Sequence, residues 1–181
     1  MLVIEGSDLV GKTNFALRCV EQLVTHGPWI YAHFGKLPDT WRFPWSYKPR
    51  MSRFIVQDRF HMSEIFYREA RKEPRRLSPF HYKLVDAWLR QLGGFTVVIT
   101  ADPKLISKRF WVEKRDHAGH TEDQILDVNR MFIESRYLEK DRDFFIHCTP
   151  QLPFPSNAMV QSILLQYLKR QEEAFDGKVL E

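Results

Sequence analysis

The sequence predicts an α/β fold in which a five-stranded parallel sheet is covered by helices on both faces. Short apolar runs alternate along the chain with longer segments of helical spacing, the pattern of successive βα units. The apolar runs contain few polar residues, as expected for strands buried on both faces. A length of 181 residues suits one domain with a buried core and is short for two. We therefore expect residues 1–181 to form a single domain.

The expected elements follow one another in strict alternation, with turn and cap residues between them. The strands are expected at residues 1–5, 29–34, 54–58, 95–101 and 144–148. Ser78 and Pro79 cap and open one helix, and Gly93 and Gly94 end it. The helices are expected at residues 14–24, 63–71, 78–92, 103–114, 122–140 and 156–170, followed by a frayed tail.

The first strand leads into a glycine loop that fits the pattern G-x-x-x-x-G-K-[ST]. The loop consists of Gly6, Ser7, Asp8, Leu9, Val10, Gly11, Lys12 and Thr13. Its glycines let backbone N–H groups turn toward phosphate oxygens, and the helix that follows adds the positive end of its dipole. Lys12 then supplies a cation for the β- and γ-phosphates, and Thr13 supplies a hydroxyl for Mg²⁺. The alternative is a plain strand-to-helix turn with a solvated lysine, and the flanking strand and helix favour the phosphate loop.

The third strand ends in Asp58, and Arg59 follows at once. The carboxyl ends of parallel strands meet at one edge of the sheet, where α/β proteins bind their ligands. A carboxylate there commonly orders Mg²⁺ or its waters in phosphate-loop enzymes. The alternative is a surface ion pair of little energetic value. Because they lie beside the phosphate loop, Asp58 and Arg59 are expected to belong to the ligand-binding site.

Two irregular segments are candidates for parts that close over a ligand. Residues 35–53 are rich in proline and aromatic rings, which suits either closure over a base or packing as a satellite cluster. Residues 114–121 form a charged, glycine-containing connection between two helices, which suits a mobile lid carrying arginine. His117 and His120 in that connection lack a third ligand nearby, so solvated histidines are favoured over a metal site.

The composition favours a globular protein with a polyanionic ligand. The net charge is +4 and the sequence pI is about 9.1, which suits nucleotides once a phosphate loop is present. No apolar run reaches the roughly eighteen residues of a membrane span, and the direct entry into a strand leaves no room for a targeting peptide. Cys19 and Cys148 occupy core-like positions without metal-ligand spacing, which suits a reduced, cytoplasmic setting.

Positive charge is concentrated in one short stretch of the chain. The stretch contains Arg68, Arg71, Lys72, Arg75 and Arg76. A solvated helix end explains it most simply, and a patch that contacts nucleic acid stays open as the alternative.

Three motifs make the chain resemble the nucleoside monophosphate kinases, most closely the thymidylate kinase group. Residues 4–13 are similar to the E-G-x-D-x-x-G-K-[ST] opening of that group. Asp58-Arg59-Phe60 with Ser63 looks like its D-R-[YFH]-x-x-S block. Residues 101–103, with arginines at 109 and 115, resemble the strand end and spaced arginines that lead into its lid. The resemblance covers essentially the whole chain, and the compact lid is similar to that of phage-encoded members.

The resemblance implies a three-layer P-loop kinase fold with a small lid at about residues 114–121. It also implies an ATP- and Mg²⁺-dependent phosphotransferase, usually a homodimer, that converts a nucleoside monophosphate to the diphosphate. A pyrimidine deoxynucleotide such as dTMP is the expected acceptor, although the family's Arg-Glu-Pro block reads Phe34 to Pro38 here. Lys36 stands in that block as a point charge in place of a planar arginine.

Residue roles follow from the same resemblance. Asp8 would accept a hydrogen bond from the acceptor's sugar hydroxyl, and Arg59 would hold the acceptor's 5′-phosphate as a bidentate fork. Lys12 would lie on the donor phosphates, and Asp58 and Thr13 near Mg²⁺. The loop has Leu9 where some members carry arginine, so Arg115 becomes the catalytic arginine and Arg109 lies against the donor base. Phe34, Lys36 and Tyr67 complete the expected acceptor site.

Two other functions stay open from the residues alone. A related kinase would phosphorylate a hydroxyl of a nucleoside, or of a modified base such as hydroxymethyluracil in DNA, with Glu5 or Asp58 as general base. A non-catalytic phosphate-loop binding module is the third interpretation, although the chain lacks the Asn-Lys-x-Asp stretch of a GTPase.

Overall fold

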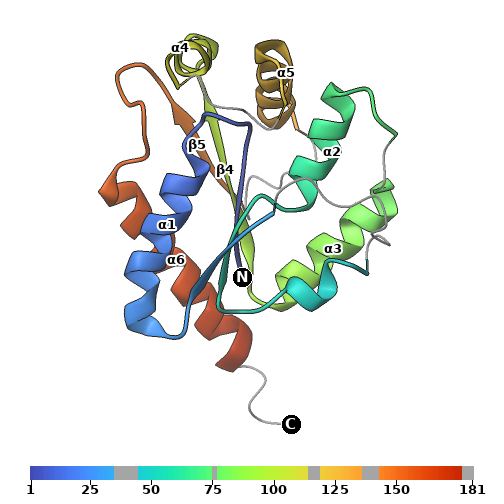
Figure 1. Cartoon of the computed structure of the whole chain (residues 1–181). Coiled ribbons are helices and arrows are strands. Elements are labelled where there is room, and N and C mark those ends of the chain that lie inside the picture. Colours follow the sequence, from blue (N-terminus) through green and yellow to red (C-terminus); the bar gives the residue numbers. More distant parts are fainter. Residues whose placement is uncertain (35–44, 75–76, 114–118, 136–142, 177–181) are drawn as a thin grey trace.

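The computed structural model describes residues 1–34, 45–74, 77–113, 119–135 and 143–176. Its centre is a five-stranded, all-parallel sheet of order β2-β3-β1-β4-β5 (Figure 1). The strands are β1 (Leu2–Glu5), β2 (Ile30–His33), β3 (Ile55–Asp58), β4 (Phe95–Ala101) and β5 (Phe144–Cys148). The predicted fold class and all five predicted strands are confirmed.

Helices cover both faces of the sheet, as Figure 1 shows. The α-helices are α1 (Lys12–Leu23), α2 (His61–Ala70), α3 (Pro79–Gln91), α4 (Pro103–Glu113), α5 (Glu122–Ile133) and α6 (Asn157–Asp176). Two short 3₁₀ helices, η1 (Val24–His26) and η2 (Lys48–Arg50), complete the described elements. A capping box opens α5, where the side chains of Thr121 and Gln124 bond reciprocally to the backbone.

Two predicted helix ends are wrong, and tertiary packing explains both. The expected helix at 122–140 ends at Ile133, one residue after the buried core residue Phe132; Ile133 and Glu134 are exposed, and residues 136–142 lie outside the described part of the chain. The last helix continues to Asp176 and not to about residue 170. Gln171 holds this extension in place, since its buried Nε2 donates to the carbonyl oxygens of Leu92 and Gly93 at 2.8 Å each.

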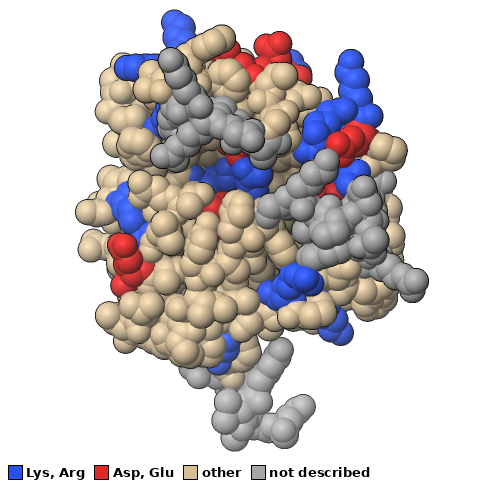
Figure 2. Space-filling model, in the orientation of Figure 1, with Lys and Arg blue, Asp and Glu red and all other residues tan. Residues whose placement is uncertain are grey.

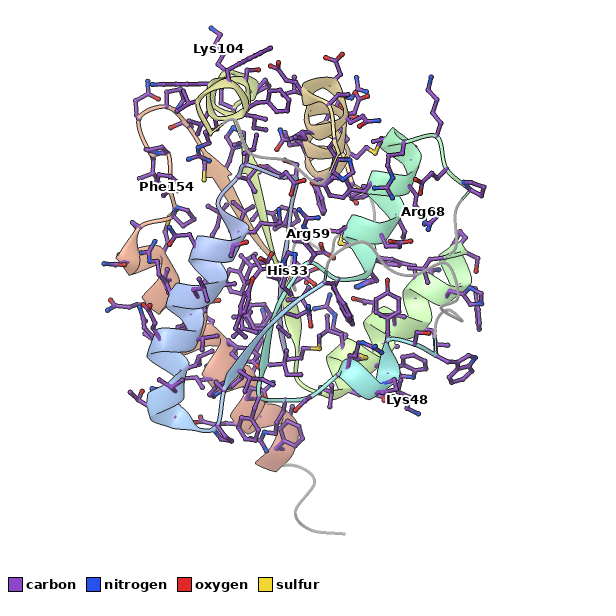
Figure 3. All side chains as sticks on the ribbon, viewed as in Figure 1. His33, Lys48, Arg59, Arg68, Lys104 and Phe154 are labelled. Carbon is purple, nitrogen blue, oxygen red and sulfur yellow. The ribbon has the colours of Figure 1, made fainter. Side chains whose placement is uncertain are left out.

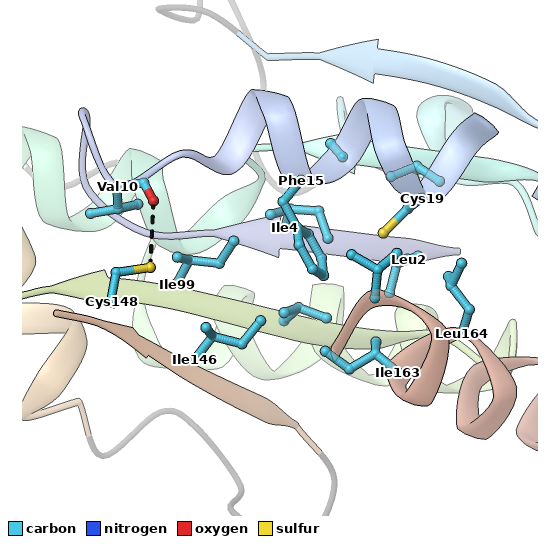
Figure 4. Close-up of a cluster of buried hydrophobic side chains, with 14 of the residues drawn as sticks. Leu2, Ile4, Val10, Phe15, Cys19, Ile99, Ile146, Cys148, Ile163 and Leu164 are labelled. Atoms are coloured by element: carbon cyan, nitrogen blue, oxygen red, sulfur yellow. Dashed lines mark hydrogen bonds between the residues drawn. The ribbon is translucent and has the colours of Figure 1, made fainter. Parts of the chain in front are cut away.

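The apolar core lies in two layers, one on each side of the sheet. Side chains of α1 and α6 pack on the first face, where Phe15 and Cys19 meet Ile163 and Leu164 (Figure 4). On the second face, α2, α3 and α5 pack on Val3 and Val98 of the strands and on Met1, which precedes β1. Both cysteines are free and buried, as predicted for core positions. Cys148 contacts the phosphate loop, with its Sγ 4.0 Å from the Val10 carbonyl oxygen.

The strand order places the candidate site at a topological switch point. The chain leaves β1 for α1 on the first face of the sheet, whereas it leaves β3 for α2 on the second face. β1 and β3 are neighbours, and the region between their carboxyl ends, here called the crevice, is where open α/β sheets bind their ligands. The glycine loop forms one side of this crevice, and the end of β3 forms the other.

No helix within the described ranges combines the length and the apolar character that crossing a bilayer requires.

Candidate functional site

The turn between β1 and α1 has a backbone that few residues allow. Gly6, Leu9 and Gly11 have positive φ angles of 142°, 67° and 94°. A Cβ on Gly6 would lie 2.1 Å from the carbonyl oxygen of Ile99, so the neighbouring strand leaves room for glycine alone. Leu9 holds a left-handed conformation without being glycine, a form of strain that concentrates at ligand-binding turns. The turn thus has the tight form that a phosphate-binding loop needs.

Lys12 is the first residue of α1, and its side chain is buried against the glycine loop. Its Nζ donates to the carbonyl oxygen of Ser7 and lies 3.8 Å from Asp8 Oδ1. Burial lowers the pKa of Lys12, while the carboxylates of Asp58 and Glu5 act to raise it. The ammonium therefore sits inside the loop, where phosphate oxygens can replace the Ser7 carbonyl as its acceptor.

Asp58, at the end of β3, is fully buried and receives three hydrogen bonds on one oxygen. Its Oδ2 accepts from Thr13 Oγ1 at 2.6 Å and from the Tyr31 hydroxyl at 3.0 Å, and it lies 3.1 Å from His33 Nδ1. Burial acts to raise the pKa of Asp58, but the hydrogen bond from His33, the charge of Lys12 and the Thr13 hydroxyl outweigh it. The pKa is thereby held below its ordinary value, and the group is a carboxylate at neutral pH.

The other oxygen of Asp58 fits a divalent cation or its waters. Oδ1 is buried and has no hydrogen-bond partner among the described residues. The Thr13 hydroxyl donates its hydrogen to Oδ2, which leaves its lone pairs available as a ligand. The described residues contain no cluster of three or more His, Cys, Asp or Glu that would cage a metal. One carboxylate and one hydroxyl, completed by substrate phosphates and water, are the set that Mg²⁺ usually takes.

Arg59 follows Asp58 and turns its guanidinium across the crevice toward the glycine loop. Its φ angle is 64°, the left-handed region that a long side chain rarely adopts. The guanidinium pairs with Asp8 Oδ1 and lies 5.1 Å from the centre of the Tyr67 ring. Asp8 Oδ2 and Arg59 Nε are buried without a partner in the described part of the chain. Figure 3 labels Arg59 near the middle of the molecule, and Figure 2 shows basic side chains at the same place.

Tyr67, on α2, joins the two sides of the crevice. Its hydroxyl oxygen accepts the backbone N–H of Asp8 at 2.6 Å, so α2 holds the glycine loop directly. His120 packs against the same ring, with 4.6 Å between ring centres. Burial and the charges of Arg71 and Arg59 lower the pKa of His120 to about 4. The expectation that His120 is solvated is therefore wrong, because it is half-buried on Tyr67; His117 lies outside the described residues.

Glu5 belongs to the fold and not to the open part of the crevice. Its Oε1 accepts the backbone N–H groups of Phe60, Met62 and Ser63 at 3.1, 3.0 and 3.4 Å. Its Oε2 accepts the Ser63 hydroxyl. These bonds explain why α2 begins at His61, before the predicted start at residue 63. A buried carboxylate engaged on both oxygens is a helix cap, which argues against Glu5 as a general base.

The aromatic segment divides into a packed part and a part outside the described residues. Trp45 contacts Trp88 with 5.5 Å between ring centres, and Tyr47 is fully buried against Phe60. The satellite-cluster interpretation thus holds for residues 45–53. Phe34, expected at the acceptor site, stacks on Phe60 at 5.7 Å and follows the end of β2. Residues 35–44, which include Lys36, lie outside the described part of the chain.

Arg109 ties α4 to the glycine loop. It donates through Nη1 to the Leu9 carbonyl oxygen and through Nη2 to that of Pro153 at 2.5 Å. Its guanidinium lies 4.3 Å from the centre of the Phe154 ring, and it is 9% exposed. The structure thus brings Arg109 beside the glycine loop, as its predicted role requires. Arg115, the predicted catalytic arginine of the lid, lies outside the described residues.

The basic stretch near α2 is largely neutralised where the structure describes it. Arg68 pairs with Glu64 and lies 3.2 Å from Glu73, and Arg71 lies 2.8 Å from Glu73. These pairs argue against a nucleic-acid patch at Arg68 and Arg71, but Arg68 is buried and not solvated as predicted, whereas Lys72 is exposed. Residues 75 and 76 are outside the described ranges.

Several residues around the glycine loop and the end of β3 were not found by sequence reasoning. Tyr31 and His33 bond to Asp58, and Phe154 packs against Arg109. His33 had a usable signal, because parallel pairing in register sets the ends of β2 and β3 side by side. Phe154 lies in a loop between β5 and α6, and no periodicity in the sequence places it.

Comparison with known proteins supports the fold alone. The chain matches no protein-family model, and comparison with curated proteins finds no similar sequence. Among solved structures, it is similar to the YorR protein of Bacillus subtilis, which was crystallised in complex with phosphorylated GDP. The TM-score is 0.71 at 17% identity, over 95% of this chain and 97% of the other. The likeness establishes the α/β architecture with a five-stranded parallel sheet.

Proposed function

We propose that this protein transfers the γ-phosphoryl group of ATP to the 5′-phosphate of a nucleoside monophosphate. The observation that carries the proposal is the pair of facing anion sites at the switch point. The glycine loop with Lys12 suits the donor phosphates, and Arg59 with its buried, unpartnered Nε suits a second phosphate across the crevice. The nucleotide bound by the structurally similar YorR protein also supports a nucleotide ligand on this fold.

In this reaction, an oxygen of the acceptor phosphate forms a bond to the γ-phosphorus while the bond to the β–γ bridging oxygen breaks. The acceptor is already ionised at neutral pH, so no general base is required. Lys12 stabilises negative charge on the donor phosphates, and Arg59 holds the acceptor phosphate in line. Arg59 pairs with the Asp8 carboxylate, and the Tyr67 hydroxyl accepts the backbone N–H of Asp8. The carboxylate held in this way would accept a hydrogen bond from a sugar hydroxyl of the acceptor. When bound at Asp58 and Thr13, Mg²⁺ would neutralise charge on the donor phosphates.

The acceptor is proposed to be a pyrimidine deoxynucleotide such as dTMP, on the resemblance of the Asp58-Arg59 and glycine-loop motifs. On the same resemblance we propose a homodimer with Arg115 as the lid arginine, and on the free, buried cysteines a cytoplasmic location. Light scattering in solution tests the dimer, and Arg115→Lys tests the arginine through a loss of turnover without loss of substrate binding.

A coupled ATP-consumption assay over all ribo- and deoxynucleoside monophosphates tests the function. Nucleosides, single-stranded DNA and hydroxymethyluracil-containing duplex DNA are run beside them. Lys12→Ala is the blank, and Lys169→Ala is the matched control, because Lys169 is a 77% exposed lysine on α6. Turnover of one or two deoxynucleoside monophosphates is the expected result. Turnover only with nucleosides or DNA would replace the proposal by hydroxyl phosphorylation, and ATP binding without turnover would favour a binding module.

A further inference from the structure

A pocket of about 410 Å³ lies between the second half of α6 and the amino ends of β2 and β3, toward the lower end of the molecule in Figure 1. We call it the Trp29 pocket; its lining includes Trp29, Phe54, Leu165, Leu168 and Gln171. Its volume is in the range of small-molecule sites, which run from roughly 300 to 1,000 Å³. Asp58 and the glycine loop lie at the carboxyl ends of the parallel strands, so the pocket is at the opposite end of the sheet from the candidate site.

Two buried polar atoms of the lining, Trp29 Nε1 and Gln171 Oε1, have no hydrogen-bond partner in the described part of the chain. Trp29 is 6% exposed and Gln171 is 5% exposed. The indole packs edge-on against the rings of Phe54 and Tyr167, which offer its N–H no acceptor. Gln171 spends its Nε2 on the turn after α3, so Oε1 is left over. Buried polar groups are nearly always paired, so a donor and an acceptor left on one pocket point to a ligand that pairs with both.

The nearby backbone groups are already paired, so side chains do the recognition. The carbonyl oxygen of Phe54 accepts the Ile30 N–H at 3.0 Å, and that of Arg53 accepts the Tyr167 hydroxyl at 3.1 Å. The Trp29 N–H donates to the Gly27 carbonyl oxygen at 2.9 Å.

Arg53 gives the pocket a fixed positive charge. Its guanidinium lies 4.9 Å from the centre of the Phe54 ring and 4.2 Å from that of the Phe175 ring, and these two contacts hold it in place. Within the ranges that the structure describes, no carboxylate pairs with this guanidinium. Its N–H groups therefore remain available to an anionic ligand.

The other charged groups of the lining are exposed and offset one another. Lys169 is 77% exposed and lies 3.9 Å from Glu173, and Glu172 adds a negative charge. The His26 side chain is also exposed to solvent. We assign these exposed groups no contact with the ligand.

We propose that the Trp29 pocket binds a small organic anion with a flat apolar body and an N–H group. The anionic group pairs with Arg53 and accepts the Trp29 indole N–H, the ligand's N–H donates to Gln171 Oε1, and the body packs on Phe54 and Leu168. The two buried atoms are covered in the unliganded protein, so binding includes a small side-chain movement that reaches them. The site goes beyond the proposed function, because it shares no residue with the crevice.

Anilinonaphthalene sulfonate is the probe, because it combines flat rings, a sulfonate and an N–H group. Its fluorescence is titrated on the full chain, with and without saturating ADP and Mg²⁺. We expect one saturable site with a dissociation constant below about 100 μM. Since the pocket lies away from the crevice, ADP should change this constant by less than about twofold. Absence of saturable binding, or displacement of the probe by ADP, would overturn the proposal and leave the proposed function standing.

NMR correlation spectra of nitrogen-labelled protein locate the bound probe. Trp29→Phe identifies the Trp29 indole signal by its disappearance. This proton should move downfield as it gains an acceptor, with the dissociation constant found by fluorescence. The Trp111 indole, which already donates to Glu122 at 2.9 Å on another face, is the internal reference and should stay in place. A Trp29 signal that does not move at saturation would place the probe elsewhere and refute the site.

Two variants measure the contribution of single groups. Trp29→Phe keeps an aromatic ring and should weaken probe binding about fivefold, the scale of one hydrogen bond. Arg53→Ala should weaken it about tenfold, and Arg53→Lys less, because the charge is kept. Arg130→Ala, at a 64% exposed arginine on α5, is the matched control and should bind as wild type does. Thermal unfolding checks that each variant folds. Wild-type affinity in both Trp29→Phe and Arg53→Ala would contradict the assignment.

Discussion

The ends of β1 and β3 each carry a buried carboxylate, and the two serve different purposes. Glu5 ends β1 and Asp58 ends β3, and the strands pair so that Ile4 lies opposite Asp58. Both side chains are fully buried at one edge of the sheet. Burial raises the pKa of Glu5 to about 7 despite the hydrogen bonds from Ser63, whereas that of Asp58 is held below its usual value.

The difference lies in what surrounds each carboxylate. Both oxygens of Glu5 accept from α2, so the group is committed to starting that helix. All three partners of Asp58 bond to Oδ2. Oδ1 is buried and has no hydrogen-bond partner within the described part of the chain, so it remains available to a ligand. Burial by itself therefore does not identify a functional acid; an oxygen left without a partner does.

The largest expected effect is that of Asp58→Asn. The variant keeps the shape of the side chain but removes the charge that faces Lys12 and the proposed Mg²⁺ site. We expect turnover to fall by about a thousandfold, the scale of losing an electrostatic group in phosphoryl transfer, with the fold retained. Initial rates and thermal unfolding measure the two quantities. Near-normal turnover would remove Asp58 from the catalytic site and make it equivalent to Glu5.

Arg59→Gly separates substrate binding from backbone strain at the end of β3. Loss of the fork to the acceptor phosphate should raise the acceptor KM by about a hundredfold. Glycine accepts a φ of 64° without strain, but the variant also removes the ion pair with the buried Asp8, so the unfolding free energy should fall by about 1 to 3 kcal/mol. Steady-state kinetics and urea unfolding provide the measurements, with Arg130→Gly on the exposed face of α5 as a control for loss of a surface arginine. An unchanged acceptor KM would contradict the assigned role.

His33→Ala removes one of the three groups on Asp58 Oδ2 and sharpens the comparison further. His33 would orient a carboxylate that faces the proposed Mg²⁺. We therefore expect its loss to lower the activity about tenfold or to raise the Mg²⁺ concentration required about tenfold. A Mg²⁺ titration of activity, and a Mn²⁺-binding titration without substrate, measure the shift. His26→Ala, at an exposed position in η1, should change neither. Equal titration curves for wild type and His33→Ala would contradict this role, because Tyr31 and Thr13 alone would then suffice to orient Asp58.

Glu5→Gln should have the smallest effect on activity, within about threefold, because Glu5 takes no part in the reaction. Its effect is expected in the pH dependence of stability. The folded pKa of about 7 lies above the ordinary value of 4.5, so the stability contributed by Glu5 is complete below about pH 4.5 and lost as the pH rises through 7.

Glutamine does not ionise, so the Glu5→Gln variant does not lose this stability as the pH rises. The unfolding free energy of Glu5→Gln relative to wild type should therefore rise between about pH 4.5 and pH 7, by up to about 3 kcal/mol. Urea unfolding at both ends of this window measures the change. Burial lowers the pKa of His61 to about 3, which costs stability as the pH falls below 6.5, but this term is common to both proteins and cancels. A flat difference over the window would contradict the assignment of Glu5 as a buried cap with a raised pKa.

Much of the fold could be predicted because its signals are local. The apolar runs of β1 to β5, the capping box at Thr121 and the glycine loop each lie within a few consecutive residues. The predicted ends failed where a distant contact sets the boundary: Gln171 extends α6 by bonding to the turn after α3, and Glu5 starts α2 from another strand. Helix boundaries of this kind depend on partners that periodicity does not reveal.

By itself, the sequence determined the class of the protein: alternating strands and helices, a phosphate loop after the first strand and an Asp-Arg pair after the third. These features follow from local backbone chemistry and from the rule that parallel strands end at one edge of the sheet. Only the tertiary structure decided which buried acid is a helix cap and which keeps an oxygen open, and it alone gathered Tyr31, His33 and Phe154 around the loop. The reason is physical, since hydrogen-bond satisfaction and burial are properties of neighbours in space and not of neighbours in the chain.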